Sequence, residues 1–254
     1  MIFHDGSTAG TATIYNTSGL TFYDDSSAGN ATLETLAGAD TRFRRNSTGG
    51  NAQLITDAGG TVDFSLERFT KQPTAGSIAG AGEYDLGAVE FTVGSNNRST
   101  EVSGIVKDGG LGGGSGASLV KVGLGTLTLS HAGNTYSGGT TLIRGTLDLA
   151  AVGAAGTGAI TFVAGKQILK IENGALLGHH FGNEIDFFGR HDVLDLTSLR
   201  FHPGATAKYH AFNDTLKVHS GHVTDILTVD APQGTHFATA GDGHGGTDVF
   251  LVFA

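Results

Sequence analysis

In the first third of this 254-residue sequence, a charged residue repeatedly follows a phenylalanine at the same spacing. Asp5 and Asp24 each lie two residues after a phenylalanine, and Arg45 has the same place after a third phenylalanine. If these phenylalanines stack on consecutive coils, the two carboxylates lie one strand apart, near the separation of about 5–5.5 Å used by retaining glycosidases. An exposed ladder of mixed charges explains the same residues without catalysis, because like charges in water cost little. We therefore favour the charge ladder over a catalytic pair.

Arg42, Arg44 and Arg45 form the basic cluster of the sequence. Alternation along a strand predicts Arg42 and Arg44 on one face and Arg45 on the other. This arrangement suits contact with an acidic glycan, whereas a polysaccharide lyase needs a base beside a carboxylate-bound cation. The sequence has no HExxH spacing and no Ser-His-Asp order of a known hydrolase. The arginines are therefore candidate ligand-binding residues, and no catalytic residue is assigned.

Five aspartates in the C-terminal third are candidate calcium ligands. Asp186, Asp192 and Asp195 lie in one segment, and Asp242 and Asp248 flank a glycine turn. Carboxylates and turn carbonyls supply the oxygen ligands that calcium prefers. The complete calcium-binding nonapeptide is missing, and aspartates also cap turns and solvate loops. Calcium is thus the one cofactor that the sequence suggests, and turn capping is the alternative.

Histidines also gather in this part, with nine of the 11 between His179 and His244. A zinc site needs three or four convergent ligands, and alternation sends neighbours such as His179 and His180 to opposite faces. Surface histidines are therefore the favoured interpretation. Charging all 11 would change the formal balance from −9 to +2, so we expect solubility or self-association to depend on pH.

The composition limits the class of protein. The chain has 42 glycines, 3 prolines, no cysteine and a formal charge of −9. Glycine at this density without a collagen period, beside many Thr, Val, Leu and Phe residues, predicts short strands joined by tight turns. The negative charge argues against nucleic acid as a partner. The sequence also has no apolar run that spans a membrane and no visible signal peptide, so it reads as a fragment or as a protein exported by another signal.

A repeat of about 20 residues begins at Phe3, Phe22 and Phe43, and Phe64 starts a fourth copy. The matching positions are Ser7, Ser26 and Ser47; Gly10, Gly29 and Gly50; Ala12, Ala31 and Ala52; Ile14, Leu33 and Leu54; and Gly19, Gly38 and Gly59. Such a repeat without a helical segment cannot bury its apolar face alone, so copies must stack. The pattern predicts an all-β, parallel β-solenoid of ten to twelve coils, with the phenylalanines stacked inside at about 4.8 Å.

The segment 108–118 is a glycine-rich loop that could be mistaken for a phosphate cradle. A phosphate loop also needs a Gly-Lys-Ser/Thr ending and a helix after it, and the sequence has neither. We therefore expect a structural loop here.

The segment 119–150 alternates aliphatic residues with threonine between glycines. It resembles the passenger-associated β-strand repeat of bacterial autotransporters at Lys121, Gly123, Gly125, Leu127, Leu129, Asn134, Tyr136, Gly138, Gly139, Thr140 and Gly145. The resemblance implies a right-handed parallel β-helix in a large secreted or surface-displayed bacterial protein. No translocator barrel follows it in this chain.

The chain divides into a β-helix over 1–165 and a β-rich C-terminal module over 166–254 that continues or caps it. In this module, 182–201 and 242–250 resemble exported bacterial repeat proteins and calcium-binding repeat domains. The strands expected here pass through Leu194 and Leu196, Leu216 and Val218, Leu227 and Val229, and Val249, Leu251 and Phe253. A cap would cover an open edge that otherwise invites pairing with other chains.

These observations favour a non-enzymatic structural or adhesive module, outside the cell or on the bacterial surface, that contacts glycans or host and cell-surface proteins. A polysaccharide lyase or glycoside hydrolase is the first alternative, because β-solenoids also carry such enzymes. A solenoid that self-associates through its ends is the second.

Overall fold

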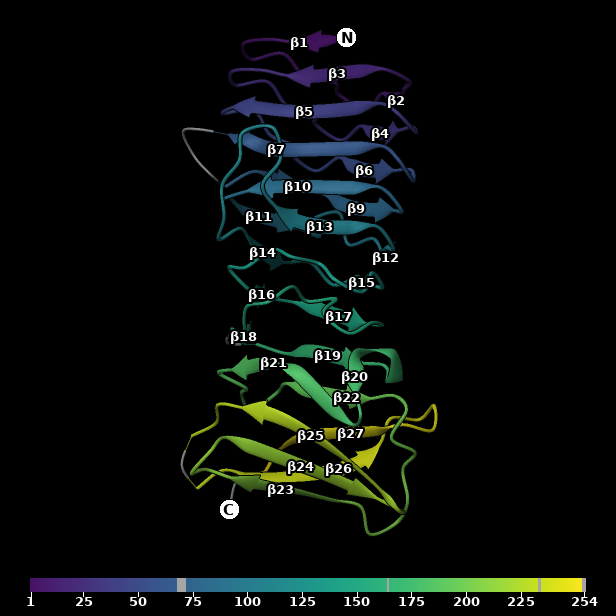
Figure 1. The fold of residues 1–254 in the computed structure, drawn as a ribbon, viewed down its shortest axis with the longest axis vertical. Coiled ribbons are helices and arrows are strands. Elements are labelled where there is room, and N and C mark those ends of the chain that lie inside the picture. The colour runs from purple at the N-terminus through teal and green to yellow at the C-terminus, as the bar shows by residue number, and fades with distance from the viewer. Residues whose placement is uncertain (68–71, 164, 233, 253–254) are drawn as a thin grey trace.

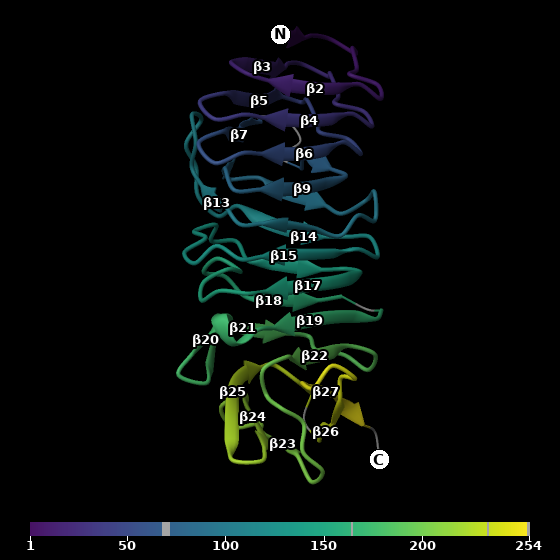
Figure 2. The same cartoon turned by 90° about the vertical axis from the view of Figure 1, so that its right-hand side faces the viewer.

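Short strands joined by glycine turns build a parallel β-solenoid in this computed structural model (Figure 1). The structure describes residues 1–67, 72–163, 165–232 and 234–252. Three sheets run along the stack, with the N-terminus at one end and the C-terminal strands at the other (Figures 1 and 2). The all-β, parallel solenoid predicted from the repeat is confirmed, and the right-handed sense of the coil stays a prediction.

Successive strands of the chain are distributed among the three sheets. In spatial order, the first sheet contains β1 (Ile2–Phe3), β3 (Gly19–Phe22), β5 (Asp40–Arg45), β7 (Thr61–Glu67), β10 (Glu83–Gly87) and β13 (Ile105–Asp108). The second sheet contains β23 (Thr206–His210), β24 (Thr215–Ser220), β25 (Val223–Val229), β21 (His180–Asp186), β18 (Ile160–Phe162), β16 (Thr140–Leu142), β14 (Ser118–Lys121), β11 (Glu90–Val93) and β8 (Thr74–Ala75), and β20 (Leu176–Leu177) pairs with β21. The third sheet contains β2 (Thr13–Asn16), β4 (Thr32–Thr35), β6 (Gln53–Thr56), β9 (Ser77–Gly80), β12 (Thr100–Val102), β15 (Thr126–Leu129), β17 (Gly145–Leu149), β19 (Gln167–Ile171), β22 (Val193–Leu196), β27 (Thr247–Val252) and β26 (His236–Gly241). A 3₁₀ turn, η1, spans Asn173–Ala175.

The number of coils follows from the strands of the third sheet. Its strands pair in parallel from β2 to β22, which gives nine coils within the described residues. The expected ten to twelve coils are wrong, for two reasons. Some coils are longer than the first repeats, because Val102 pairs with Leu129, 27 positions later. After Leu196 the chain also turns largely to antiparallel hairpins.

The predicted aromatic ladder fills the interior beside the first sheet. The rings of Phe3, Phe22, Phe43 and Phe64 stack with centroid distances of 4.7, 5.0 and 4.5 Å, and their planes are within 7° of parallel. Phe91 extends the ladder from the second sheet at 4.5 Å with a tilted ring. Each stacked pair adds about 0.5–1.5 kcal/mol beyond the burial of its area, so the ladder fixes the register of the first coils.

An aliphatic column fills the interior beside the third sheet. Leu127, Leu147, Leu169 and Leu194 are directly in register on four consecutive coils, and all four are buried. Side chains alternate between the two faces of a strand, so the residues next to these leucines along each strand point outward. In the sequence, the leucines therefore mark the inner face of this sheet and the polar residues between them mark its outer face.

Antiparallel strands continue the sheets at the C-terminal end. β27 pairs with β22 and with β26, while β25 pairs with β21 in parallel and with β24 in antiparallel fashion. Aromatic contacts continue the core between them, because Phe188 contacts Phe162 at 5.4 Å and Phe237 at 5.9 Å. The predicted strands through Leu194, Leu216, Leu227 and Val249 are confirmed, and Phe253 lies outside the described residues.

The division of the chain at residue 165 stays a prediction. Parallel pairing continues past that point, since β17 pairs with β19 and β19 with β22 in the same register. Within the part of the chain that the structure describes, there is no helix with the length and apolar character needed to cross a bilayer.

Candidate functional site

Two members of the arginine cluster, Arg44 and Arg45 at the end of β5, lie beside the ring of Tyr23. Arg45 donates a hydrogen bond from Nη1 to Oδ1 of Asp24 at 2.7 Å, and its guanidinium carbon lies 4.4 Å from the Tyr23 ring centroid. The guanidinium carbon of Arg44 lies 5.7 Å from the same centroid. Cations over an aromatic face are attracted by its quadrupole, so Tyr23 organises both side chains.

The expectation that Arg44 and Arg45 lie on opposite faces is wrong. Both guanidinium groups reach one ring, because Arg45 has a left-handed backbone with φ of 66°. Strict alternation holds only while the backbone stays extended. The corner therefore gathers two of the three predicted ligand-binding arginines at one place.

Ion pairs offset much of the charge of this cluster. Arg42 donates to Asp40 at 2.8 Å, and Arg45 is bound to Asp24. A hollow of about 310 Å³ at the corner is lined by Asp24, Asp25, Arg45 and Asn46, which carry mixed charge. Contact of these arginines with an acidic glycan stays a prediction.

Asp5, Asp24 and Arg45 occupy the same corner on three consecutive coils, each with a left-handed backbone. The carboxylate of Asp24 is held by Arg45 of the next coil. This arrangement fits the ladder of mixed charges favoured from the sequence. It gives Asp24 a structural partner.

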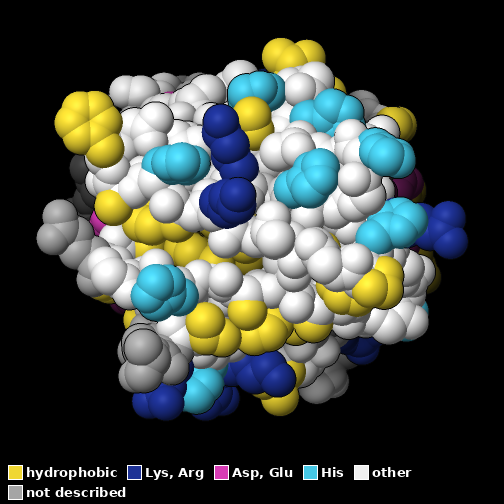
Figure 3. Space-filling model, turned by 90° about the horizontal axis from the view of Figure 1, so that it is seen from below, with side chains coloured by type: hydrophobic (Ala, Val, Ile, Leu, Met, Phe, Trp, Pro, Cys, Tyr) yellow, Lys and Arg dark blue, Asp and Glu magenta, His cyan; other side chains and the backbone are white. Residues whose placement is uncertain are grey.

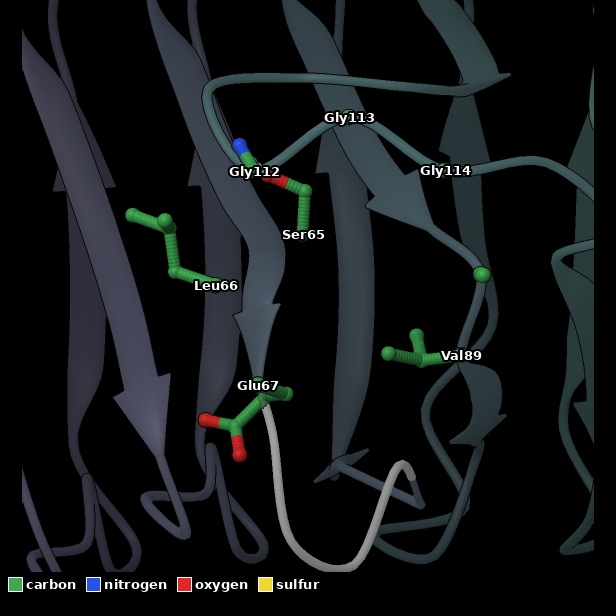
Figure 4. A pocket seen from close by; sticks show the side chains of 8 residues that line it. Ser65, Leu66, Glu67, Val89, Gly112, Gly113 and Gly114 are labelled. Carbon is green, nitrogen blue, oxygen red and sulfur yellow. Dashed lines mark hydrogen bonds between the residues drawn. The ribbon is translucent and has the colours of Figure 1, made fainter.

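A cavity lies beside β7 and is bordered by the glycine-rich loop. It measures about 450 Å³ and is lined by Ser65, Leu66, Glu67, Ala88, Val89, Gly112, Gly113 and Gly114. Figure 4 shows Glu67 at the end of β7 and Ser65 beside the loop at Gly112. Among the described residues of this lining, Glu67 is the one titratable group.

Glu67 is a buried acid with an altered proton affinity. Glu67 is only 5% exposed. Burial raises the pKa of Glu67 to about 7, and a hydrogen bond donated by Ser47 Oγ at 3.1 Å partly opposes that rise. Paired-carboxylate chemistry needs an acid and a base in separate roles. One such group alone does not assemble that chemistry.

The glycine-rich loop over 108–118 binds carboxylates of its own chain. The amide of Leu111 donates to Asp63, and the carboxylate of Asp108 accepts the amides of Gly116 and Ala117 at 3.0 and 2.9 Å. The strand β14 follows the loop, where a phosphate loop needs a helix. The expectation of a structural loop is confirmed.

The structure brings three of the five candidate calcium ligands, Asp195, Asp242 and Asp248, close together and places Asp186 and Asp192 elsewhere. Asp195 lies directly opposite Asp248 in the antiparallel pair of β22 and β27. Asp242 caps the following turn, where its Oδ1 accepts the amides of three residues that follow it. Asp192 accepts the amides of Gly189 and Gln167 instead, and the pKa of Asp186 is raised by burial and by Asp230.

The group around Asp195 is electrostatically strained. Burial, followed by the charges of Asp248 and Asp242, raises the pKa of Asp195 to about 6, and Lys170 opposes the rise. Burial and Asp242 also raise the pKa of Asp248. These carboxylates therefore repel one another at neutral pH.

No metal centre is evident within the described ranges of the chain. There, no three His, Cys, Asp or Glu side chains gather in a way that could hold a metal ion. His179 instead shares a hydrogen bond of 2.9 Å with the buried carboxylate of Asp225, and His219 with Thr224. Calcium binding stays an untested prediction.

Lys121 is a buried cation inside the repeat-like segment. It is 1% exposed, and its Nζ donates to the carbonyl oxygens of Val122, Gly123 and Arg144 at 2.8, 3.1 and 3.1 Å. Burial lowers the pKa of Lys121 to about 8. Its ammonium group has three donors for these three acceptors. The sequence assigned it no role, although its place two residues after the buried Leu119 predicts an inward side chain.

Asn134 bridges neighbouring coils in the same segment. Its Oδ1 accepts the amide of Val106 at 2.8 Å, and its Nδ2 donates to the carbonyl of Ala154 at 2.7 Å. The hydroxyl of the buried Tyr136 shares a hydrogen bond of 2.7 Å with Thr140. Polar residues of this segment thus hold the stack together from inside.

Comparison with known families identifies this same segment. A family model described as passenger-associated-transport-repeat matches residues 119–149. These residues run from β14 to β17 in the middle of the stack. Searches of curated proteins and of solved structures give no match to the chain. The chain therefore carries a passenger-type repeat within a parallel β-solenoid.

Proposed function

We propose that this chain is a non-enzymatic structural module of a secreted or surface-displayed bacterial protein, built like the passengers of autotransporters. One observation carries the proposal. The passenger-associated repeat at 119–149 lies within a continuous parallel stack, and its strands pair with coils on both sides. The repeat is thus part of the rod itself and not an appendage.

The module would act by holding its outer faces and loops at a distance from the cell. Each coil of a solenoid contacts its neighbours, so stiffness comes from the sum of coil interfaces. The stacked Phe22 and Phe43 and the bridging Asn134 supply such interfaces here. Loops on this scaffold, including the arginine corner around Tyr23, are the candidate contacts for glycans or surface proteins.

The C-terminal hairpins would close the rod. An exposed edge of a solenoid invites addition of strands from other chains. Here β26, β27 and the strands β23 to β25 occupy that end of the stack (Figure 2). A closed end favours a discrete module over open-ended assembly.

Surface display tests this role. The chain would be placed between an export signal and a translocator barrel, and its exposure on intact cells measured by protease accessibility. We expect display of the unaltered chain. Asn134→Ala should lower display severalfold, because it leaves the amide of Val106 and the carbonyl of Ala154 unpaired.

Thr135→Ala is the matched control, since Thr135 is the exposed neighbour of Asn134. It should be displayed like the unaltered chain. Failure of the unaltered chain to reach the surface, or equal display of both variants, would contradict the proposal.

A polysaccharide-active enzyme is the second candidate, and the cavity at Glu67 is the observation that favours it. The purified chain would be incubated with neutral and anionic polysaccharides and the release of reducing ends measured. We expect no release. If the chain releases reducing ends and the Glu67→Gln variant does not, the protein is an enzyme and the structural role is contradicted.

A further inference from the structure

Two lysines lie opposite each other on the outer side of the second sheet, at its C-terminal end. Lys208 of β23 lies directly opposite Lys217 of β24, and both side chains are exposed. The same row continues through Ile226 of β25 to His180 of β21. Like charges directly opposite on neighbouring strands destabilise a sheet, so nothing in the fold accounts for this pair.

Histidines flank that row of paired residues on both sides along the strands. His219 lies opposite Thr206, and His210 lies opposite Thr215. Both are exposed, as is His180. We call Lys208, Lys217, His180, His210 and His219 the cationic face. Figure 3 shows histidines around Lys and Arg side chains at this end of the molecule, with few Asp or Glu side chains in view.

Few carboxylates oppose these charges. Glu184 of β21 is exposed at the end of the neighbouring row, opposite Thr228. Asp225 of β25 is buried and bound to His179, and Asp214 in the β23–β24 turn accepts the hydroxyl of Tyr209. Asp230, exposed just after β25, acts with Asp214 on Tyr209. Carboxylates therefore border the cationic face, whose own charged side chains are lysines and histidines, on a chain of formal charge −9.

We propose that the cationic face binds an acidic polysaccharide and binds it more tightly as the pH falls. Neighbouring strands lie about 4.8 Å apart and so place cations at similar steps across the sheet, which suits a polymer with regularly repeated charges. Histidine gains positive charge between about pH 8 and pH 5. His180, His210 and His219 lie beside the two lysines on this face.

A polysaccharide fits this face better than an anionic bilayer does. Binding to a bilayer depends on buried apolar side chains as well as on charge. The row on the cationic face contains Ile226, which is half-buried. Phe212 in the β23–β24 turn is fully exposed at the edge of the face, where it offers a ring for stacking on a sugar. This binding role does not depend on display of the module.

Binding to polygalacturonate, dextran sulfate and neutral dextran would be measured at low salt. We expect binding to both acidic polymers, none to neutral dextran, and affinity at least about tenfold higher at pH 5.5 than at pH 8. Lys208→Gln with Lys217→Gln should weaken binding about tenfold at either pH. Arg98→Gln with Lys166→Gln removes the same charge from exposed sites elsewhere and should have little effect.

A second pair of variants separates the pH effect from folding. His210→Gln with His219→Gln should keep the affinity at pH 8 and lose most of the gain at pH 5.5. The control, His4→Gln with His191→Gln, changes exposed histidines elsewhere and should keep the gain.

Circular dichroism would confirm that each variant is folded. Equal losses in the lysine variant and its control, an affinity independent of pH, or stronger binding to phosphatidylserine vesicles than to either polymer would overturn the proposal.

Discussion

Asp195 of β22 lies directly opposite Asp248 of β27, where the last solenoid coil meets the C-terminal hairpin. Burial and the neighbouring carboxylates raise the pKa of Asp195 to about 6, above the value of about 3.9 in an unfolded chain. The folded state therefore binds the proton more tightly than the unfolded state. The stability linked to this proton is complete below about pH 4 and is lost as the pH rises through about 6.

Removing this charge should stabilise the protein at neutral pH. We expect Asp195→Asn to raise the free energy of unfolding at pH 7.5 by about 1 kcal/mol, a value reduced for solvent screening. The difference should become negligible at about pH 3.5, below the pKa of the unfolded chain. Urea unfolding at both pH values measures it, with Asp57→Asn as a control in a turn of the solenoid. Destabilisation at pH 7.5, together with calcium-dependent stability of the unaltered chain, would indicate a calcium site instead.

Phe43 should be the most sensitive ring of the ladder, because it is fully buried and stacks on both Phe22 and Phe64. Phe43→Ala should cost about 3–5 kcal/mol of unfolding free energy. Phe3→Ala should cost less, since Phe3 is half-buried and stacks on one ring within the described residues. Urea unfolding compares the two. Equal losses would mean that the ladder does not hold the coils together.

Gly50 and Gly10 test the close approach of neighbouring coils. Both have a φ near 60°, but a Cβ on Gly50 would lie 2.9 Å from Ser27 Oγ and 3.0 Å from the Gly29 carbonyl oxygen, whereas one on Gly10 meets nothing within 4 Å. Gly10→Ala should cost about 1–2 kcal/mol from the left-handed backbone alone. Gly50→Ala should cost clearly more. A thermal melt in which both variants lose the same stability would show that the coils do not approach this closely.

Lys121 should contribute to stability through the three carbonyls that it binds. Lys121→Met leaves these buried acceptors unpaired and should cost about 2 kcal/mol or more. Lys166→Met, at an exposed lysine, should change stability by less than about 0.5 kcal/mol. Unfolding in urea at pH 7 measures both. If Lys121→Met leaves the free energy of unfolding unchanged, water replaces the ammonium as the donor to these carbonyls.

The periodic parts of the fold were predictable from the sequence. A period of two places Leu127, Leu129 and Leu147 inward, and the repeat from Phe3 places its phenylalanines in one column. Both patterns depend on contacts between equivalent residues of consecutive coils. A repeat in the sequence therefore translates directly into stacking.

Other features depend on departures from the repeat. The left-handed backbone of Arg45 reverses the expected face of its side chain. The pairing of Asp195 with Asp248 joins strands far apart in the chain, and no local pattern specifies it. Lengthened coils, such as the one between Val102 and Leu129, changed the number of turns. These features follow from tertiary packing and not from local spacing.

The structural role depends on one continuous stack, which distances between labelled coils measure directly. Tyr15, Glu101 and Lys170 lie in one outward column of the third sheet, with Glu101 four coils and Lys170 seven coils from Tyr15. The chain has no cysteine, so cysteines introduced there accept spin labels specifically.

Double electron–electron resonance would be recorded on Tyr15→Cys combined with Glu101→Cys, and on Tyr15→Cys combined with Lys170→Cys. With about 4.8 Å per coil, narrow distributions near 19 Å and 34 Å are expected. Distances that do not increase with the number of intervening coils would contradict the continuous rod and the role proposed for it.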